Sequence, residues 1–282
     1  MPTIEVNGVE LYYEEHGSGE ENFIFVHGGV YGSEIWEWSG FWDVFPKDYH
    51  AYAIDLRGHG KSVNITKNWT YPQWTDDVVQ ISRALNLNKF IFVGISMGTG
   101  VGYHLMVDHP EVLKGVVAIA PFPLERGVPL PLEDPKVQAM VLKQWRNEPA
   151  IRTSVERRFP PSTDKALEEK RVKWRQELVD YHMNMTKEKH TFVPPRPLLH
   201  IETEAEMEAF LSKNTMPTLL LCGGKDRKSV PTWGFRTAMA VNGAKLVLFQ
   251  EEGHAVGLSE HPEKIVEEIE LFVNQLNRML KT

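Results

Sequence analysis

The chain has few of the features that mark secreted, membrane-bound or nucleic-acid-binding proteins. Its 282 residues include one cysteine, Cys222, so an internal disulfide cannot form. The 31 Lys and Arg residues are outnumbered by 38 Asp and Glu residues, and no segment is rich in Lys or Arg. The resulting formal charge of −7 argues against nucleic acid or an anionic membrane as the main partner.

Targeting segments and cofactor motifs are scarce as well. The N-terminal residues lack the basic segment and apolar stretch of a signal peptide, and no apolar run approaches the roughly 18 residues of a membrane span. No His and Cys residues stand at zinc-ligand spacing, and no glycine-rich loop is of the phosphate-binding type. We therefore expect a cytoplasmic enzyme with a small-molecule substrate, no membrane partner, and neither metal ion nor organic cofactor. The oligomeric state is left open.

Apolar runs alternate with amphipathic stretches, except in the middle of the chain. An Asn7-Gly8 pair between two strand-like segments predicts a hairpin near the N-terminus. The expected strands lie at 23–26, 51–55, 90–93, 116–120, 218–222 and 245–249. The expected helices between them lie at 74–85, 101–107 and 231–241. This alternation predicts an α/β protein with a mostly parallel, doubly wound sheet.

Ser96 is the strongest candidate for a catalytic residue. It stands at the centre of Gly94-Ile95-Ser96-Met97-Gly98, directly after the expected strand 90–93 and before the expected helix 101–107. A Gly-x-Ser-x-Gly turn in this setting is typical of a nucleophile elbow, which holds the serine hydroxyl clear of the sheet. We expect the two glycines to be required because a side chain at either position would collide with a neighbouring element.

A serine nucleophile needs a base, and the base needs an orienting acid. Asp226 follows the expected strand 218–222, and His254 follows the expected strand 245–249. The carboxyl ends of parallel strands meet at one sheet edge, so we expect both residues near Ser96. Glu251 and Glu252 precede His254 too closely to reach round its ring. The sequence therefore predicts Ser96 as nucleophile, His254 as base and Asp226 as the acid.

With these motifs the chain resembles the α/β-hydrolase superfamily, in its serine-hydrolase branch, from about Glu10 to about Leu276. His27-Gly28-Gly29 looks like the oxyanion loop of the family, and the segment 55–62 looks like the loop after its fourth strand. The resemblance implies that the backbone N–H groups of Gly29 and Met97 form the oxyanion hole. We expect His27 and His59 to make structural hydrogen bonds, and Arg57 and Lys61 to tie loops together or face solvent.

From about residue 121 to 214 the chain becomes charged and punctuated by proline, with helices expected at 136–146, 165–185 and 202–211. The superfamily carries its cap at this place, so we expect a core at 1–120 and 215–282 with a helical cap at 121–214. Five candidates for the substrate pocket follow from position and size: Tyr31, Trp36, Trp145, Trp174 and Met183. For Trp36, packing on the sheet is an equal alternative, and for Trp38 and Trp42 it is the favoured one.

The resemblance also narrows the activity. Ser96 stands where epoxide hydrolases and haloalkane dehalogenases use Asp, and Met97 stands where proline iminopeptidases typically carry Trp. We therefore expect a carboxylesterase that acts on small to medium esters through an acyl-enzyme. The alternatives are a lactonase, a carbon–carbon bond hydrolase of diketone-like acids, and, from another class, a ligand receptor on a hydrolase scaffold.

Overall fold

The computed structural model describes residues 2–29, 31–62, 70–122, 134–159, 161–186, 203–226, 231–254 and 261–279. The chain divides into two compact units. The core unit comprises Met1–Val128 and Pro194–Thr282, and the insertion unit comprises Pro129–Val193. The insertion unit is thus shorter than the segment 121–214 in which we expected a cap. The helix α9 (Glu204–Leu211) belongs to the core unit, because it packs against α10 (Pro231–Ala240).

The core unit is built on one sheet with the strand order β1-β2-β4-β3-β5-β6-β7-β8. The strands are β1 (Thr3–Val6), β2 (Val9–Gly17), β3 (Glu21–Val26), β4 (Tyr49–Ile54), β5 (Phe90–Ile95), β6 (Leu113–Ile119), β7 (Thr218–Gly223) and β8 (Lys245–Phe249). The pairs β1–β2 and β2–β4 are antiparallel, and all other pairs are parallel. The prediction of a mostly parallel sheet is confirmed, and so is the hairpin, whose turn residues Asn7 and Gly8 have φ of 50° and 71°.

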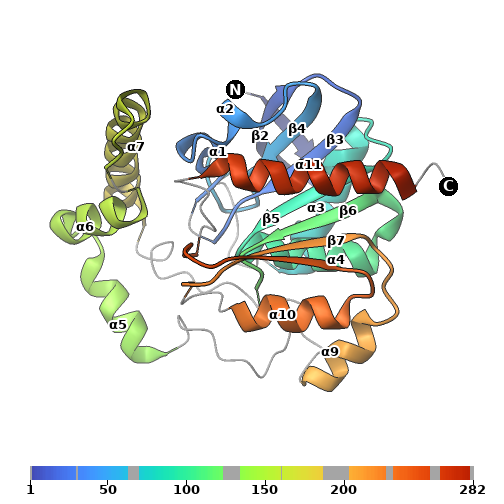
Figure 1. Cartoon of the computed structure of the whole chain (residues 1–282). Coiled ribbons are helices and arrows are strands. Elements are labelled where there is room, and N and C mark those ends of the chain that lie inside the picture. The colour runs from blue at the N-terminus through green and yellow to red at the C-terminus, as the bar shows by residue number, and fades with distance from the viewer. Residues whose placement is uncertain are drawn as a thin grey trace. The chain divides into compact units, whose positions relative to one another are not determined.

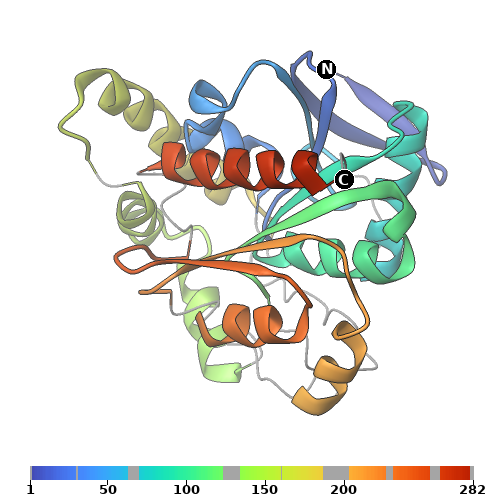
Figure 2. The ribbon, with the colours of Figure 1, turned by 45° about the vertical axis from the view of Figure 1, so that its right-hand side comes forward.

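Helices cover both faces of this sheet, as Figures 1 and 2 show. One face carries α1 (Glu34–Trp38), α2 (Phe41–Val44) and α11 (Pro262–Met279), which share a hydrophobic core with inward-facing residues of the strands. The other face carries α3 (Tyr71–Ala84) and α4 (Met97–Asp108), with a 3₁₀ turn at Pro110–Val112 after α4. Every residue of β5 is buried, which explains its apolar sequence up to Gly94.

The insertion unit contains three helices among its described residues: α5 (Pro135–Gln144), α6 (Glu148–Arg158) and α7 (Lys165–Asn184). Helices α5 and α7 coincide with predicted ones, whereas α6 was missed. Pro149 looks like a helix breaker in the sequence, but it lies in the first turn of α6, where a proline leaves no hydrogen bond unmade. The side chain of Asn147 caps the helix by accepting from the N–H of Ala150.

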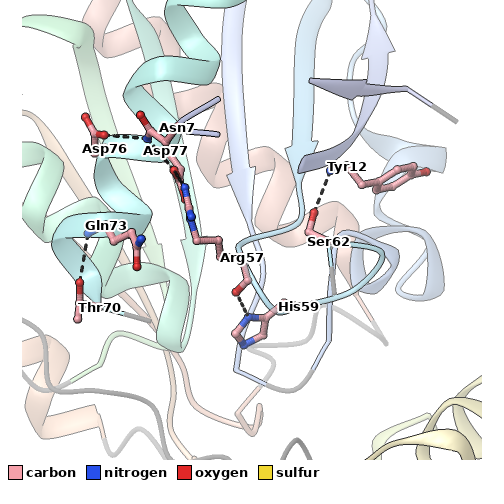
Figure 3. Close-up of polar contacts among 9 residues, drawn as sticks. All are labelled: Asn7, Tyr12, Arg57, His59, Ser62, Thr70, Gln73, Asp76 and Asp77. Atoms are coloured by element: carbon pink, nitrogen blue, oxygen red, sulfur yellow. Dashed lines mark hydrogen bonds and ion pairs between the residues drawn. The ribbon is translucent and has the colours of Figure 1, made fainter. Parts of the chain in front are cut away.

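A buried ion pair fastens the loop after β4 to helix α3 (Figure 3). The guanidinium of Arg57 donates to both carboxylate oxygens of Asp77, at 2.6 and 2.7 Å. Only 5% of Arg57 and 1% of Asp77 are exposed. Because a buried charge without a partner is strongly destabilising, each of the two side chains requires the other. The side-chain amide of Asn7 adds hydrogen bonds to Asp76 and Asp77 from the β1–β2 turn. Arg57 therefore ties loops together, as expected, and does not face solvent.

Candidate active site

Ser96 occupies the sharp turn between β5 and α4. Its φ of 52° is in the left-handed region, where a non-glycine residue is strained. Both glycines of the turn are required for close approach. A Cβ on Gly94 would lie 2.6 Å from the carbonyl oxygen of Gly98, and a Cβ on Gly98 would lie 2.7 Å from the carbonyl oxygens of Val26 and His27. In the part of the chain that the structure describes, the Ser96 hydroxyl caps no N–H of α4, so it is available for other contacts.

The loops that carry Asp226 and His254 meet because β7 ends in glycine. Gly223 lies so close to the loop after β8 that an added Cβ would be 2.1 Å from the carbonyl oxygen of Gly253. Hydrogen bonds from the N–H of Gly224 to the oxygen of Phe249 and from the N–H of Lys225 to the oxygen of Glu252 hold the two loops together. This contact brings residues 28 positions apart in the sequence side by side.

Ser96, His254 and Asp226 form one chain of hydrogen bonds. The Oγ of Ser96 lies 3.0 Å from Nε2 of His254, and Nδ1 of His254 lies 2.8 Å from Oδ2 of Asp226. An ionised carboxylate only accepts hydrogen bonds, so Nδ1 carries the ring proton and Nε2 accepts the proton of the hydroxyl. The Asp226 side chain has no exposed surface, whereas the His254 side chain is 29% exposed. The imidazole is thus anchored at one nitrogen and accessible at its edge.

Glu251 and Cys222 lie near these loops, one exposed and the other buried. Glu251 is exposed, and its carboxylate pairs with the ammonium group of Lys225. Burial, with a smaller contribution from the charge of Asp226, raises the pKa of the Cys222 thiol to about 12. The thiol is therefore protonated at neutral pH, which agrees with its interpretation as a small buried hydrophobic residue.

The loop after β3 lies beside the nucleophile. A Cβ on Gly28 would be 3.6 Å from the Cβ of Ser96. His27 fixes the peptide group between Gly28 and Gly29, because its Nδ1 lies 2.6 Å from the carbonyl oxygen of Gly28 and its Nε2 accepts from the N–H of Leu56 at 3.1 Å. The N–H of Gly29 belongs to the same peptide group and points away from that carbonyl. Met97 is the first residue of α4, where an N–H has no partner within the helix.

A pair of carboxylates, the buried Asp55 and the half-buried Glu34, supports the far end of the same loop, and sequence reasoning missed it. Oε1 of Glu34 accepts from the N–H of Gly32 at 2.9 Å, and Oδ1 of Asp55 accepts from the N–H of Ser33 at 2.5 Å. Oδ2 of Asp55 accepts from the N–H of Lys61 at 2.6 Å. Both carboxylates approach Gly32 closely, since a Cβ there would be 2.5 Å from Asp55 and 2.6 Å from Glu34.

Burial and the charge of Asp55 raise the pKa of Glu34 to about 7. Burial also raises the pKa of Asp55, and the charge of Glu14 adds to this increase. The charge of Lys61 has the opposite effect on Glu34 and lowers the pKa of that carboxyl group. A carboxyl group with a raised pKa stabilises the folded state below its unfolded pKa of about 4.5, and this contribution is lost as the pH rises through about 7.

Replacing Glu34 by Gln is therefore expected to stabilise the protein at about pH 8 and to change stability little at about pH 5. The amide oxygen retains the hydrogen bond from Gly32, and the neutral side chain removes the repulsion by Asp55. We expect a gain of about 2 kcal/mol at the higher pH, measured by urea unfolding. Glu37→Gln, at an exposed position of the same helix, serves as the control and should change stability equally at both pH values. If Glu34→Gln changes stability equally at both pH values, repulsion between the two carboxylates is not the cause of the change.

The structure separates the aromatic pocket candidates of the core unit. Trp36 is fully buried and packs against Phe25 and Phe41, with ring centroids 5.0 and 5.3 Å away. It therefore lies in the hydrophobic core, as the packing alternative required. Tyr31 is half-buried and makes an edge-to-face contact with Trp38 at 5.9 Å. Tyr31 thus remains a candidate for substrate contact.

In the insertion unit, Trp174 is 4% exposed, and Trp145 and Met183 are half-buried. The indole nitrogen of Trp145 donates to the carbonyl oxygen of Met185 and so links the end of α5 to the end of α7. Neither membrane-spanning helices nor metal-binding groups of three or more His, Cys, Asp or Glu side chains occur among the described residues.

The fold is that of an α/β hydrolase. Residues 23–268 match the Alpha/beta hydrolase family. Because this match covers most of the chain, the protein belongs to that family.

Curated relatives span different shares of the chain. The AB hydrolase superfamily protein YisY of Bacillus subtilis is 26% identical over 94% of this chain and 96% of its own length. The (E)-2-((N-methylformamido)methylene)succinate hydrolase of Acinetobacter baylyi is 24% identical over 92% of both chains. The dihydrolipoyllysine-residue acetyltransferase component of the acetoin cleaving system of Cupriavidus necator is 31% identical over 42% of this chain, which spans only 31% of that protein.

Solved structures agree in fold over nearly the whole chain. An esterase of Exiguobacterium antarcticum superposes with a TM-score of 0.73 at 20% identity, covering 95% of this chain and 97% of its own. The enol-lactonase of Burkholderia xenovorans gives 0.72 at 20% identity, with coverage of 97% and 100%. A meta-cleavage product hydrolase of Pseudomonas fluorescens gives 0.72 at 18% identity, covering 98% of each chain. At these identities the likeness concerns the fold.

Proposed function

We propose that the protein is a serine hydrolase that cleaves small to medium carboxylic esters through an acyl-enzyme. The observation that carries this proposal is the unbroken hydrogen-bond chain from Ser96 through His254 to the buried carboxylate of Asp226. A hydroxyl in contact with an imidazole whose tautomer is fixed by a carboxylate is the arrangement that activates a serine for attack on a carbonyl.

In this mechanism, Oγ of Ser96 bonds to the ester carbonyl carbon while Nε2 of His254 takes the hydroxyl proton. The backbone N–H groups of Gly29 and Met97 stabilise the negative charge that develops on the carbonyl oxygen. The imidazolium returns its proton to the departing alcohol, which leaves the acyl group on Ser96. Water then attacks the acyl-enzyme in the same way and releases the carboxylic acid.

We further propose that the insertion unit is a cap that contributes to the substrate pocket. In the sequence this unit comes after β6, and the end of β6 lies beside the nucleophile, since the N–H of Ser96 donates to the carbonyl oxygen of Ile119 at 2.8 Å. The half-buried Trp145 and Met183 offer apolar surface of the kind that lines ligand pockets.

Hydrolysis of a lactone or of a carbon–carbon bond in a diketone-like acid is the second candidate. It would use the same nucleophile and oxyanion donors, and the enol-lactonase and the meta-cleavage product hydrolase share the fold. A pure ligand receptor is disfavoured by the assembled hydrogen-bond chain, because binding alone does not require an activated serine.

Two measurements test the proposal. A fluorophosphonate should label Ser96, as identified by mass spectrometry of the labelled peptide, and a receptor with an inactive serine would remain unlabelled. A panel of p-nitrophenyl esters, lactones and diketo acids should give the highest kcat/KM for an ester. A lactone or diketo acid that exceeds every ester would transfer the assignment to the second candidate.

Substitutions in the insertion unit should change which substrate is preferred. If the unit is a cap, Trp145→Ala, Trp174→Ala or Met183→Ala should alter the ranking of esters of increasing acyl size by about tenfold for at least one of the three. The rate of labelling by a small phosphonate should stay within about twofold, since the reacting groups belong to the core unit. Val172→Ala, at an exposed position of α7, is the matched control. An unchanged ranking in all three variants would contradict the cap proposal.

A further inference from the structure

The backbone of Ser96 is held at both ends of the residue. Its N–H donates to the carbonyl oxygen of Ile119 at 2.8 Å, and its carbonyl oxygen accepts twice from Thr99. One of these hydrogen bonds comes from the Thr99 N–H at 2.9 Å, and the other comes from the Thr99 hydroxyl at 2.6 Å. Since a carbonyl oxygen can only accept, the hydroxyl proton points at Ser96.

The hydroxyl oxygen of Thr99 has a second partner. It accepts from the N–H of Phe122 at 2.9 Å, three residues after Ile119. The hydrogen bonds therefore close a ring that runs from the Ser96 N–H to Ile119, along the chain to Phe122, through the Thr99 hydroxyl and back to the Ser96 carbonyl. Thr99 is fully buried, so water does not compete for these bonds.

The carbonyl of Ser96 and the N–H of Met97 are the two ends of one planar peptide group. A hydrogen bond that fixes the direction of the carbonyl therefore also fixes the direction of the N–H. His27 acts on the carbonyl of Gly28 in the same way, and the N–H at the other end of that peptide group is that of Gly29. Each proposed oxyanion donor thus belongs to a peptide group whose carbonyl is bound by a side chain.

We propose that Thr99 is a positioning residue, whose hydroxyl aims the Met97 N–H at the oxyanion by binding the Ser96 carbonyl. This inference rests on the proposed serine-hydrolase function. Thr99 does not touch the substrate. It acts by keeping the peptide group that follows the strained residue Ser96, whose φ is 52°, in the one orientation that places the donor correctly.

The test compares two matched pairs of variants. Wild type and Thr99→Val differ in a hydroxyl and have nearly the same shape, and Thr99→Ser and Thr99→Ala form a second pair without the methyl group. We expect kcat for the best ester in the panel to fall about 10- to 100-fold from the hydroxyl-bearing to the hydroxyl-free member of each pair, while KM changes less than about threefold. Thr99→Ser should retain most of the wild-type kcat even where its melting temperature is lower.

A transition-state analogue supplies a readout that a purely structural role would not move. An alkyl trifluoromethyl ketone forms a tetrahedral adduct with its oxygen in the oxyanion hole, so its inhibition constant should rise in each hydroxyl-free variant about as much as kcat falls. Inhibition by the carboxylate product should change little. The folded fraction of each variant is measured by fluorescence-monitored unfolding, and each rate is divided by that fraction. If Thr99→Val does not fold, the comparison of Thr99→Ser with Thr99→Ala tests the inference.

Each outcome separates this inference from the proposed function. If the wild type hydrolyses esters and both pairs show equal kcat, Thr99 has no positioning role and the function stands. If kcat follows the melting temperature and not the hydroxyl, the role is structural and the inference is wrong. If the wild type neither hydrolyses any substrate nor reacts with the fluorophosphonate, the proposed function itself is overturned.

Discussion

Replacing Ser96 by Ala is expected to lower ester hydrolysis by at least about 10⁴-fold while the protein remains folded. The substitution removes the oxygen atom that would carry the acyl group. Water would then have to attack the ester directly. Binding and the oxyanion donors would still contribute, which is why a small residual rate over water is expected.

The hydroxyl of Ser96 contributes little to stability, since the side chain that it contacts is the partly exposed His254 and the backbone of the turn is held by main-chain and Thr99 hydrogen bonds. The melting temperature of Ser96→Ala should therefore stay close to that of the wild type. The measurement is kcat/KM for the best ester, with labelling by the fluorophosphonate as a second readout that must disappear. A variant that retains more than about a tenth of the wild-type turnover would remove Ser96 from the mechanism.

The central strands β5 and β7 could be predicted from the sequence because they are nearly uninterrupted apolar runs. Residues 90–95 and 218–223 are buried throughout, and a strand buried on both faces has no polar positions that could confuse its assignment. Ser96, Asp226 and His254 could be selected for the same reason. Ser96 and Asp226 follow buried strands and His254 follows the less buried β8. Parallel strands bring their carboxyl ends to one edge of the sheet.

The supporting contacts could not be predicted in this way, because they depend on how two loops approach each other. Asp55 reaches the N–H of Ser33 across 22 residues, and Thr99 reaches the N–H of Phe122 across 23 residues. No periodicity or local propensity relates such positions. A polar residue that stands where the pattern predicts a buried site, such as Thr99 in the first turn of α4, is the one signal that the sequence offers.

Asp226→Asn is expected to reduce kcat by about 10³- to 10⁴-fold, although the side chain keeps nearly the same shape. The carboxylate can only accept a hydrogen bond, so it holds the proton of His254 on Nδ1 and leaves Nε2 free to receive the proton of Ser96. An asparagine can turn its amide group toward the ring and donate to Nδ1. The ring proton then moves to Nε2, where it blocks the transfer from the serine hydroxyl.

The variant also removes the negative charge that stabilises the imidazolium formed during attack. The Asp226 side chain has no exposed surface, so solvent does not replace this charge. The loss should appear mainly in kcat, and KM should change by less than about tenfold, because Asp226 contacts the base and not the substrate.

Glu251→Gln and Glu252→Gln are the controls for this assignment, since both carboxylates lie in the loop that carries His254. The carboxylate of Glu251 is exposed and pairs with Lys225, so its loss removes a surface ion pair of small energetic value. Both control variants should keep kcat within about threefold of the wild type. If Asp226→Asn is mild and one of the two glutamate variants loses activity, the acid that orients His254 is that glutamate. The hydrogen bond between Asp226 and His254 would then be a structural contact, and the proton relay would have to run through the loop that precedes His254.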